Sequence, residues 1–174
     1  MVSYVKMVTM SGKTPLKFFE TLVLISKLLA GRKFAFRGTT SLILQGIDMV
    51  ADDIDILCDK GTALASNYLL REYLVEEVSY KKSPKFKSFF GKFKVNETKV
   101  EIYGEWQIKD TKGNWSNPFI AINRHNITYK GKEFYVTDIE DELLVYALMG
   151  RWNAFHKIKR QLKAKETSTQ TSLF

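Results

Sequence analysis

The stretch from Phe34 to Leu57, FAFRGTTSLILQGIDMVADDIDIL, constrains the fold of this chain more than any other. It predicts a short apolar strand, a Gly-Thr turn, a short helix over 40–45 and a second strand over 53–58. Asp53 and Asp55 lie two residues apart on that second strand, so their side chains point to the same face. Two carboxylates at about 4 Å repel by roughly 4 kcal/mol at an effective dielectric near 20. We therefore expect a cation beside them, most simply a divalent metal ion.

Length and composition predict one compact domain. The chain has 174 residues, and 45% of them are hydrophobic, which is enough to bury a substantial core. We expect a single domain over residues 1–165, with a helical C-terminal part over 137–165 that opens with a capping box at Thr137 and Glu140. The Ser/Thr/Gln-rich segment 166–174 is predicted to be a disordered tail.

The chain is basic, with 27 Lys and Arg against 19 Asp and Glu and a net charge of +8. This balance fits a polyanionic partner such as nucleic acid, and it fits an ordinary lysine-rich surface equally well. The segment 81–94 carries six lysines and four phenylalanines without an acid. Either it is a strand or loop with packed rings and solvated lysines, or it follows a phosphate backbone and offers its rings to bases.

Cysteine and hydropathy patterns bear on location. Cys58 is the single cysteine, so an intrachain disulfide is excluded and a cytoplasmic setting is expected. One cysteine and two histidines do not make the usual zinc site. The longest apolar stretch is far shorter than the roughly 20 residues of a membrane span, and the N-terminal pattern does not predict a signal peptide.

The residues around the two aspartates suit transfer of a nucleotide from a triphosphate. Such a reaction needs divalent ions to neutralise charge and a precise placement of the acceptor hydroxyl. Asp53 and Asp55 supply two oxygen ligands, and Glu101 supplies a third if its predicted strand, 98–103, lies beside theirs. The turn Gly38-Thr39-Thr40 precedes a helix N-terminus, where backbone N–H groups and the helix dipole favour phosphate.

This pattern resembles the nucleotidyltransferase signature of the DNA polymerase beta superfamily. That signature is a hydrophobic residue, Gly with Gly or Ser, about a dozen residues, and an Asp-hydrophobic-Asp strand. The chain is similar to small prokaryotic minimal nucleotidyltransferase-like proteins, including those of toxin–antitoxin modules. The segment 137–160, with its Gly150-Arg151 pair and Lys157, is also similar to the C-terminal helices of that group.

The resemblance implies an α/β (α+β) fold, a nucleotidyltransferase-like mixed sheet flanked by helices. It implies a metal-dependent enzyme that transfers NMP from an NTP such as ATP to a hydroxyl on RNA, a protein or a small molecule. The cofactor would be Mg²⁺ or Mn²⁺, and an antitoxin would be a further partner. The implied catalytic and metal-binding residues are Asp53, Asp55 and Glu101. The implied nucleotide-binding residues are Gly38, Thr39, Thr40, Arg151 and Lys157.

Three positions depart from the signature. Arg37 stands where a hydrophobic residue is usual, and Thr39 stands where the signature has Gly or Ser. The third carboxylate is a glutamate, and Glu105 lies on the same strand parity as Glu101, so either can complete the site. If the bulk of Thr39 excludes a triphosphate, the alternative is a catalytically inactive module of the same fold that binds nucleic acid or a protein partner.

Overall fold

The computed structural model describes residues 16–171, which fold into helices and strands close to those that the sequence predicts. In chain order the elements are α1 (Leu16–Leu28), β1 (Phe34–Arg37), α2 (Gly38–Leu44), β2 (Asp53–Cys58), α3 (Lys60–Leu69), the 3-10 helix η1 (Arg71–Tyr73), β3 (Leu74–Lys82), β4 (Phe86–Val95), β5 (Thr98–Ile108), β6 (His125–Tyr129), β7 (Lys132–Val136), α4 (Ile139–Leu148) and α5 (Trp152–Thr171). The predicted α/β (α+β) fold class is confirmed.

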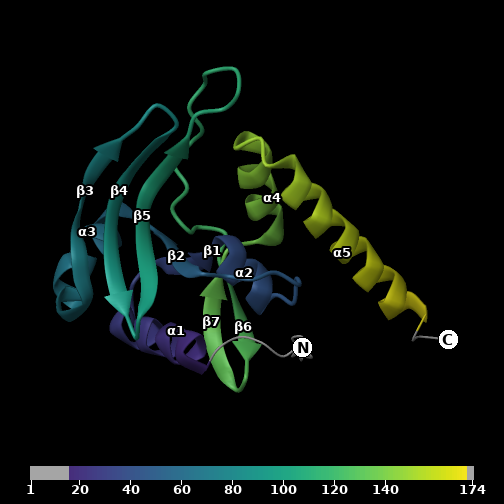
Figure 1. Ribbon diagram of the computed structural model, residues 1–174, viewed down its shortest axis with the longest axis horizontal. Coiled ribbons are helices and arrows are strands. Elements are labelled where there is room, and N and C mark those ends of the chain that lie inside the picture. The colour runs from purple at the N-terminus through teal and green to yellow at the C-terminus, as the bar shows by residue number, and fades with distance from the viewer. Residues whose placement is uncertain (1–15, 172–174) are drawn as a thin grey trace.

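One mixed sheet organises the described part of the chain (Figure 1). Its seven strands lie in the order β3-β4-β5-β2-β1-β7-β6. The pairs β2–β5 and β1–β7 are parallel, and the other neighbours are antiparallel. The aspartate strand β2 therefore lies between β1 and β5, in the interior of the sheet. Neighbours on both sides fix its register, and with it the positions of its side chains.

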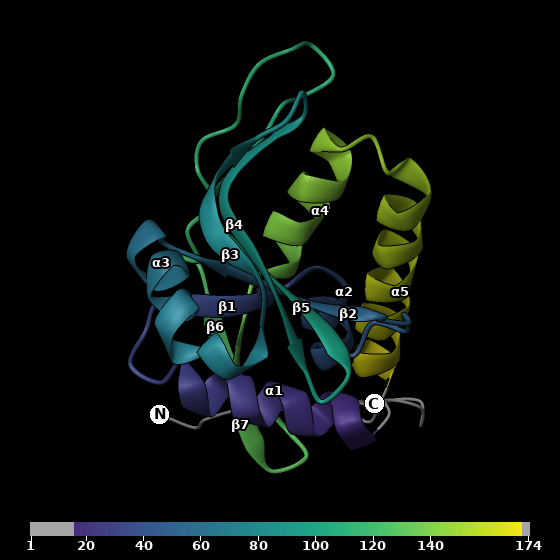
Figure 2. The ribbon, with the colours of Figure 1, turned by 60° about the vertical axis from the view of Figure 1, so that its left-hand side comes forward.

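The two faces of the sheet carry different chemistry. On one face, Phe36, Ile54 and Val100 from three adjacent strands pack with α1 and α3, where Leu22 and Ile25 are fully buried. On the opposite face, a smaller cluster of apolar side chains packs against α4, and α4 in turn packs against α2 and α5. Figure 2 shows α4 and α5 side by side, on the far side of the molecule from α3. The charged side chains of Arg37, Asp55 and Glu101 lie on this second face, because they alternate with Phe36, Ile54 and Val100 along their strands.

The strand β5 contains a bulge that decides which of its side chains reach the second face. In its pairing with β4, Gly104 lies opposite Phe89 and Gln107 lies opposite Lys87. Three steps along β5 therefore match two steps along β4, so β5 has one extra residue over this interval. Glu105 lies in the interval with a positive φ of 48°. Because an extra residue reverses the alternation of a strand, Trp106 lies on the same face as Tyr103.

Three predictions about local structure are corrected. Helix α5 continues to Thr171, so the predicted disordered tail is helical as far as the structure describes it. The capping box at the start of α4 does not form, because the hydroxyl of Thr137 donates to the carboxylate of Glu142 and Asp138 is the N-cap. The sequence FIAI at 119–122 also predicts a short strand, but the structure has only an isolated bridge between Phe119 and Trp106 there.

The basic segment 81–94 is divided between β3 and β4, and its side chains lie on opposite faces. Phe93 is fully buried in the main core, whereas Phe90 lines a cavity on the other face. The ammonium of Lys87 lies 4.0 Å from the ring centroid of Trp115, and that of Lys92 lies 3.2 Å from a carboxylate oxygen of Glu76. The segment thus does not present one continuous strip of lysines and rings.

In the part of the chain that the structure describes, none of the helices is both long and apolar enough to cross a membrane.

Candidate functional site

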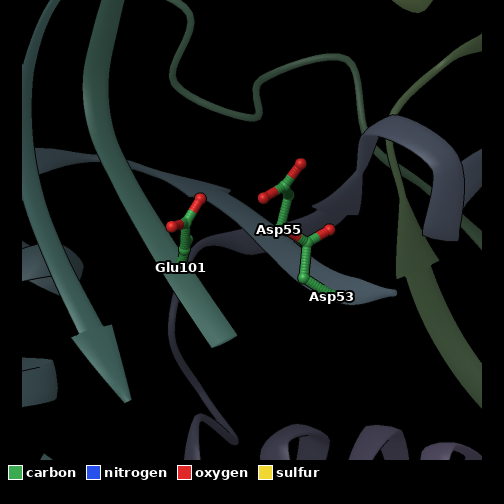
Figure 3. A group of neighbouring side chains, drawn as sticks. All are labelled: Asp53, Asp55 and Glu101. Carbon is green, nitrogen blue, oxygen red and sulfur yellow. The ribbon is translucent and has the colours of Figure 1, made fainter. Parts of the chain in front are cut away.

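Strand pairing brings the three predicted carboxylates together. Asp55 is the direct neighbour of Glu101 in the parallel pair of β2 and β5. Asp53, two residues before Asp55, lies on the same face. One carboxylate oxygen from each of the three residues lies within 4.8 Å of the others. Figure 3 shows the three side chains projecting from the two strands on the same side of the sheet.

The structure separates the two candidates for the third carboxylate. Glu101 pairs with Asp55 across the strands, whereas Glu105 lies in the bulge of β5 and is not part of the cluster. Simple strand parity could not distinguish the two residues, because parity assumes unbroken alternation. The hydroxyl of Tyr103 donates to Oε2 of Glu101 at 2.7 Å and orients that carboxylate.

Arg37 provides a buried positive charge at the edge of the cluster. It lies directly opposite Asp55 in the antiparallel pair of β1 and β2, with Nη1 3.5 Å from Oδ2 of Asp55. Its Nη2 lies 3.4 Å from Oε2 of Glu142, and its guanidinium carbon lies 4.2 Å from the ring centroid of Trp106. Two acids and an indole ring therefore compensate the cost of burying this cation.

Asp55 carries an unsatisfied oxygen. Its Oδ1 is buried and, among the described residues, has no hydrogen-bond partner. Burial raises the pKa of Asp55 to about 6, against the opposing effect of the nearby Arg37. That value already includes the smaller raising effects of the Asp53 and Glu101 charges. Because a buried carboxylate oxygen without a partner is costly, this atom is suited to a cation that the strand neighbours do not supply.

Lys99 bridges the other two acids. It is the strand neighbour of Asp53, and its Nζ lies 2.8 Å from Oδ2 of Asp53 and 3.3 Å from Oε1 of Glu101. The hydrogen bond to Asp53 raises the pKa of Lys99. Lys99 is not among the residues that the sequence predicts for the site. Its position two residues before Glu101, on the same strand face, is the signal that could have identified it.

The turn at Gly38 forms where it was predicted, and the backbone N–H of Gly38 donates a hydrogen bond to a side chain. Gly38 has a φ of +62°, and a Cβ at this position would lie 3.0 Å from Oδ2 of Asp55, so glycine suits both the backbone and the close approach. Its N–H donates to Oε1 of Glu142 at 2.8 Å. Thr40 is buried and its hydroxyl donates to the carbonyl of Asp53, whereas Thr39 is partly exposed.

Glu142 is a component of the site that sequence analysis missed. It is 2% exposed and accepts from the N–H of Gly38, from the hydroxyl of Thr137 at 2.6 Å and from Arg37. A signal was present in Arg37 itself, because a charged residue within an apolar strand needs a buried partner. The sequence could not say which of the acids in the first turn of α4 supplies it.

A cavity of about 510 Å³ opens beside Asp55. It is lined by Gly38, Thr39 and Asp55 and by residues of α4. Aromatic side chains from β4 and β5 form another part of the wall, namely Phe86, Phe90, Tyr103 and Trp106. Positively charged residues in the lining are Arg37, Lys81, Lys82 and Arg151. Lys157, the other basic residue predicted to bind nucleotide, is exposed on α5 and does not line this cavity.

Comparisons with solved structures give a consistent result. The structure is similar to that of TM1012 from Thermotoga maritima, a candidate nucleotidyltransferase, with a TM-score of 0.68 and 24% sequence identity over 83% of this chain and 94% of that one. It is also similar to the lincosamide antibiotic adenylyltransferase LnuA, with a TM-score of 0.54 and 17% identity over 84% of this chain and 96% of LnuA. The fold is therefore nucleotidyltransferase-like.

Sequence comparison adds no further relative. No protein-family model matches the chain, and no curated protein matches it.

Proposed function

We propose that the chain is a metal-dependent nucleotidyltransferase that transfers NMP from an NTP to a hydroxyl acceptor. The observation that carries the proposal is the cluster of Asp53, Asp55 and Glu101, with the buried, unpartnered Oδ1 of Asp55, next to a cavity that begins at Gly38 and Thr39. A nucleotidyltransferase-like fold, shared with TM1012 and LnuA, supports it.

The residues fit a magnesium or manganese ion. Carboxylate oxygens are the ligands that these hard cations prefer, and three converge here within 4.8 Å of one another. A divalent ion would satisfy Oδ1 of Asp55 and offset the burial and the acid–acid repulsion that together raise the pKa of this residue. When bound, such an ion would neutralise charge that develops on the transferred phosphoryl group.

The cavity fits the nucleotide. Its volume, about 510 Å³, falls within the usual range for small-molecule sites. Basic side chains such as Arg37 and Arg151 suit phosphates, and aromatic rings such as that of Trp106 suit a base. In the proposed site, Thr39 and Arg151 contact the nucleotide directly. Gly38 and Thr40 shape the turn, since the N–H of Gly38 and the hydroxyl of Thr40 already have partners.

In the proposed reaction, the acceptor oxygen bonds to the α-phosphorus and the bond from that phosphorus to the pyrophosphate oxygen breaks. The hydroxyl proton passes to the carboxylate beside the acceptor, and pyrophosphate leaves with the electron pair. Glu101, held by Tyr103, lies at the edge of the cluster farther from Arg37 and is the carboxylate proposed to stand beside the acceptor. RNA, a protein and a small molecule all remain acceptors of suitable chemistry. LnuA, an antibiotic adenylyltransferase, supports the small-molecule class.

The test is calorimetric titration of each NTP into the protein, with Mg²⁺ and then with EDTA. We expect metal-dependent binding of at least one NTP by the wild type and its loss in the double variant Asp53→Asn/Asp55→Asn. The exposed neighbour Asp52 supplies a matched control, because Asp52→Asn removes a charge from the same segment and should leave binding unchanged. Pyrophosphate release would then be assayed with candidate acceptors.

Two outcomes would contradict the proposal. One is absence of NTP binding by a well-folded wild type. The other is binding that neither EDTA nor the double substitution alters. The first would favour the inactive module, in which Thr39 obstructs the triphosphate, and the second would place nucleotide binding outside the acidic cluster. A role in a toxin–antitoxin pair is a separate prediction, which a growth assay with and without the neighbouring gene would test.

A further inference from the structure

Lys99 occupies the carboxylates that a metal would need. Its ammonium hydrogen-bonds Asp53 at 2.8 Å and lies 3.3 Å from Oε1 of Glu101. We infer that Lys99 is a built-in counter-ion that competes with the metal for these two acids and turns to the polyphosphate of the nucleotide when the metal binds. This inference rests on the proposed function and deepens it, because it makes Lys99 a positioning residue for both ligands.

Competition follows from geometry and charge. A magnesium ion takes carboxylate oxygens at about 2.0–2.1 Å, and a lysine ammonium on the same oxygens is a like charge within a few ångströms of it. Asp55 is not an ion-pair partner of Lys99: its Oδ2 faces Arg37, and its Oδ1 is buried without a partner among the described residues. The metal and the ammonium therefore cannot both hold Asp53 and Glu101 at full strength.

The neighbouring acids do not offer Lys99 another partner. On β4, Lys94 is the direct strand neighbour of Lys99, and it pairs with Glu97 at 2.6 Å. Lys92, next to Glu101, pairs with Glu76. Since Glu97 and Glu76 already have lysine partners, an ammonium displaced from the cluster would be available to the phosphates of a bound nucleotide.

Lys99 is free to make this movement. Its side chain is 52% exposed and ends a flexible four-carbon stem, whereas Arg37, the other cation at the cluster, is 9% exposed and held by two acids. The two cations thus have different roles in the inference. Arg37 is a fixed charge that stays with Asp55, and Lys99 is a mobile charge that exchanges partners.

The inference predicts effects of opposite sign on two ligands. In Lys99→Met, Mn²⁺ affinity measured by electron paramagnetic resonance of the free ion should rise by about fivefold, because the metal no longer displaces an ion pair. Affinity for magnesium tripolyphosphate, measured by calorimetry at saturating Mg²⁺, should fall by about fivefold, because the cation that the metal releases is lost. Lys99→Arg keeps the charge and should stay within about twofold of the wild type in both assays.

Lys94→Met is the matched control. It removes the same charge from the neighbouring position on the same face without touching the acidic cluster. An equal rise in Mn²⁺ affinity in Lys94→Met and Lys99→Met would overturn the inference, since net charge would then explain both. Unchanged Mn²⁺ affinity in Lys99→Met would overturn it too, and unchanged tripolyphosphate affinity would overturn its second half.

These outcomes are distinguishable from failure of the proposed function. Wild-type Mn²⁺ binding that Asp53→Asn/Asp55→Asn abolishes would uphold the metal site whatever Lys99→Met does. If the wild type does not bind Mn²⁺, binding gained by Lys99→Met would support the inference strongly. Absence of binding in both proteins would overturn the metal site and the inference together.

Discussion

Arg37 and Glu142, which are 105 residues apart in the sequence, form a buried ion pair with Nη2 3.4 Å from Oε2. The same glutamate accepts the N–H of Gly38, so one side chain of α4 fixes both the turn and the cation beside the acidic cluster. The sheet and the C-terminal helices are thereby joined at the candidate site. This contact explains why α4 forms part of the site although it carries none of the predicted metal ligands.

Removing the carboxylate of Glu142 should destabilise the fold. Glu142→Ala leaves Arg37 and the N–H of Gly38 without this partner inside the protein, and the expected cost is about 3 to 5 kcal/mol in the free energy of unfolding. Urea denaturation followed by circular dichroism measures it. Glu140→Ala, an exposed change in the same helical turn, should cost about 0.5 kcal/mol or less. Equal losses in the two variants would show that the ion pair is not structurally important.

Asp55 should make stability depend on pH in an unusual direction. Its folded pKa of about 6 lies above the ordinary 3.8, so between these values the folded chain holds a proton that the unfolded chain has released. The carboxyl therefore lowers the free energy of unfolding as pH rises from about 4 to about 6, and the cost stays constant above that window.

Asp55→Asn should accordingly stabilise the protein by about 2 to 3 kcal/mol at pH 8 and by little at pH 4, since one pKa unit corresponds to about 1.4 kcal/mol. Chemical denaturation at the two pH values, in EDTA, measures the difference. A stability gain that is the same at both values would contradict the assignment of the raised pKa. A gain on removing a proposed metal ligand is the expected trade-off between stability and function.

Gly38 should be less tolerant of substitution than Gly150. Both have positive φ values, +62° and +69°, but a Cβ at Gly38 would meet Oδ2 of Asp55 at 3.0 Å and one at Gly150 would meet nothing within 4 Å. Gly150→Ala should cost about 1 to 2 kcal/mol from backbone strain alone. Gly38→Ala should cost about 1 kcal/mol more, because Asp55 must shift. Thermal unfolding compares them, and equal costs would indicate that Asp55 moves freely.

Thr39 should contribute its hydroxyl to nucleotide binding. Thr39→Val keeps the shape and removes the donor, so NTP affinity should fall about tenfold, the effect of losing a hydrogen bond to a charged group. Thr39→Ser should stay within about twofold of the wild type, because the donor remains. The calorimetric titration described above measures both. A large gain in affinity for Thr39→Ser would instead identify the methyl group as an obstacle to the triphosphate.

The two basic residues predicted to bind nucleotide should differ. Arg151 lines the cavity and Lys157 does not. Arg151→Ala should therefore weaken NTP binding about tenfold, whereas Lys157→Ala should change it less than about twofold at physiological salt. If Lys157→Ala has the larger effect, the nucleotide lies along α5 and not in the cavity.

The sequence by itself determined the local part of the site. The spacing of Asp53 and Asp55 placed both carboxylates on one strand face, and Gly38 marked the turn before α2. Those features depend on alternation along a strand and on backbone sterics, which act within a few residues. Strand β2 accordingly forms with the predicted bounds, 53–58.

Only the tertiary structure decided which distant groups join them. The choice of Glu101 over Glu105 depends on a bulge in the pairing of β4 with β5, and the partner of Arg37 depends on how α4 packs against the sheet. The bridge from Lys99 to Asp53 depends on the parallel register of β2 and β5. Register and packing are set by the burial of side chains from several elements at once, so the pattern of one segment does not encode them.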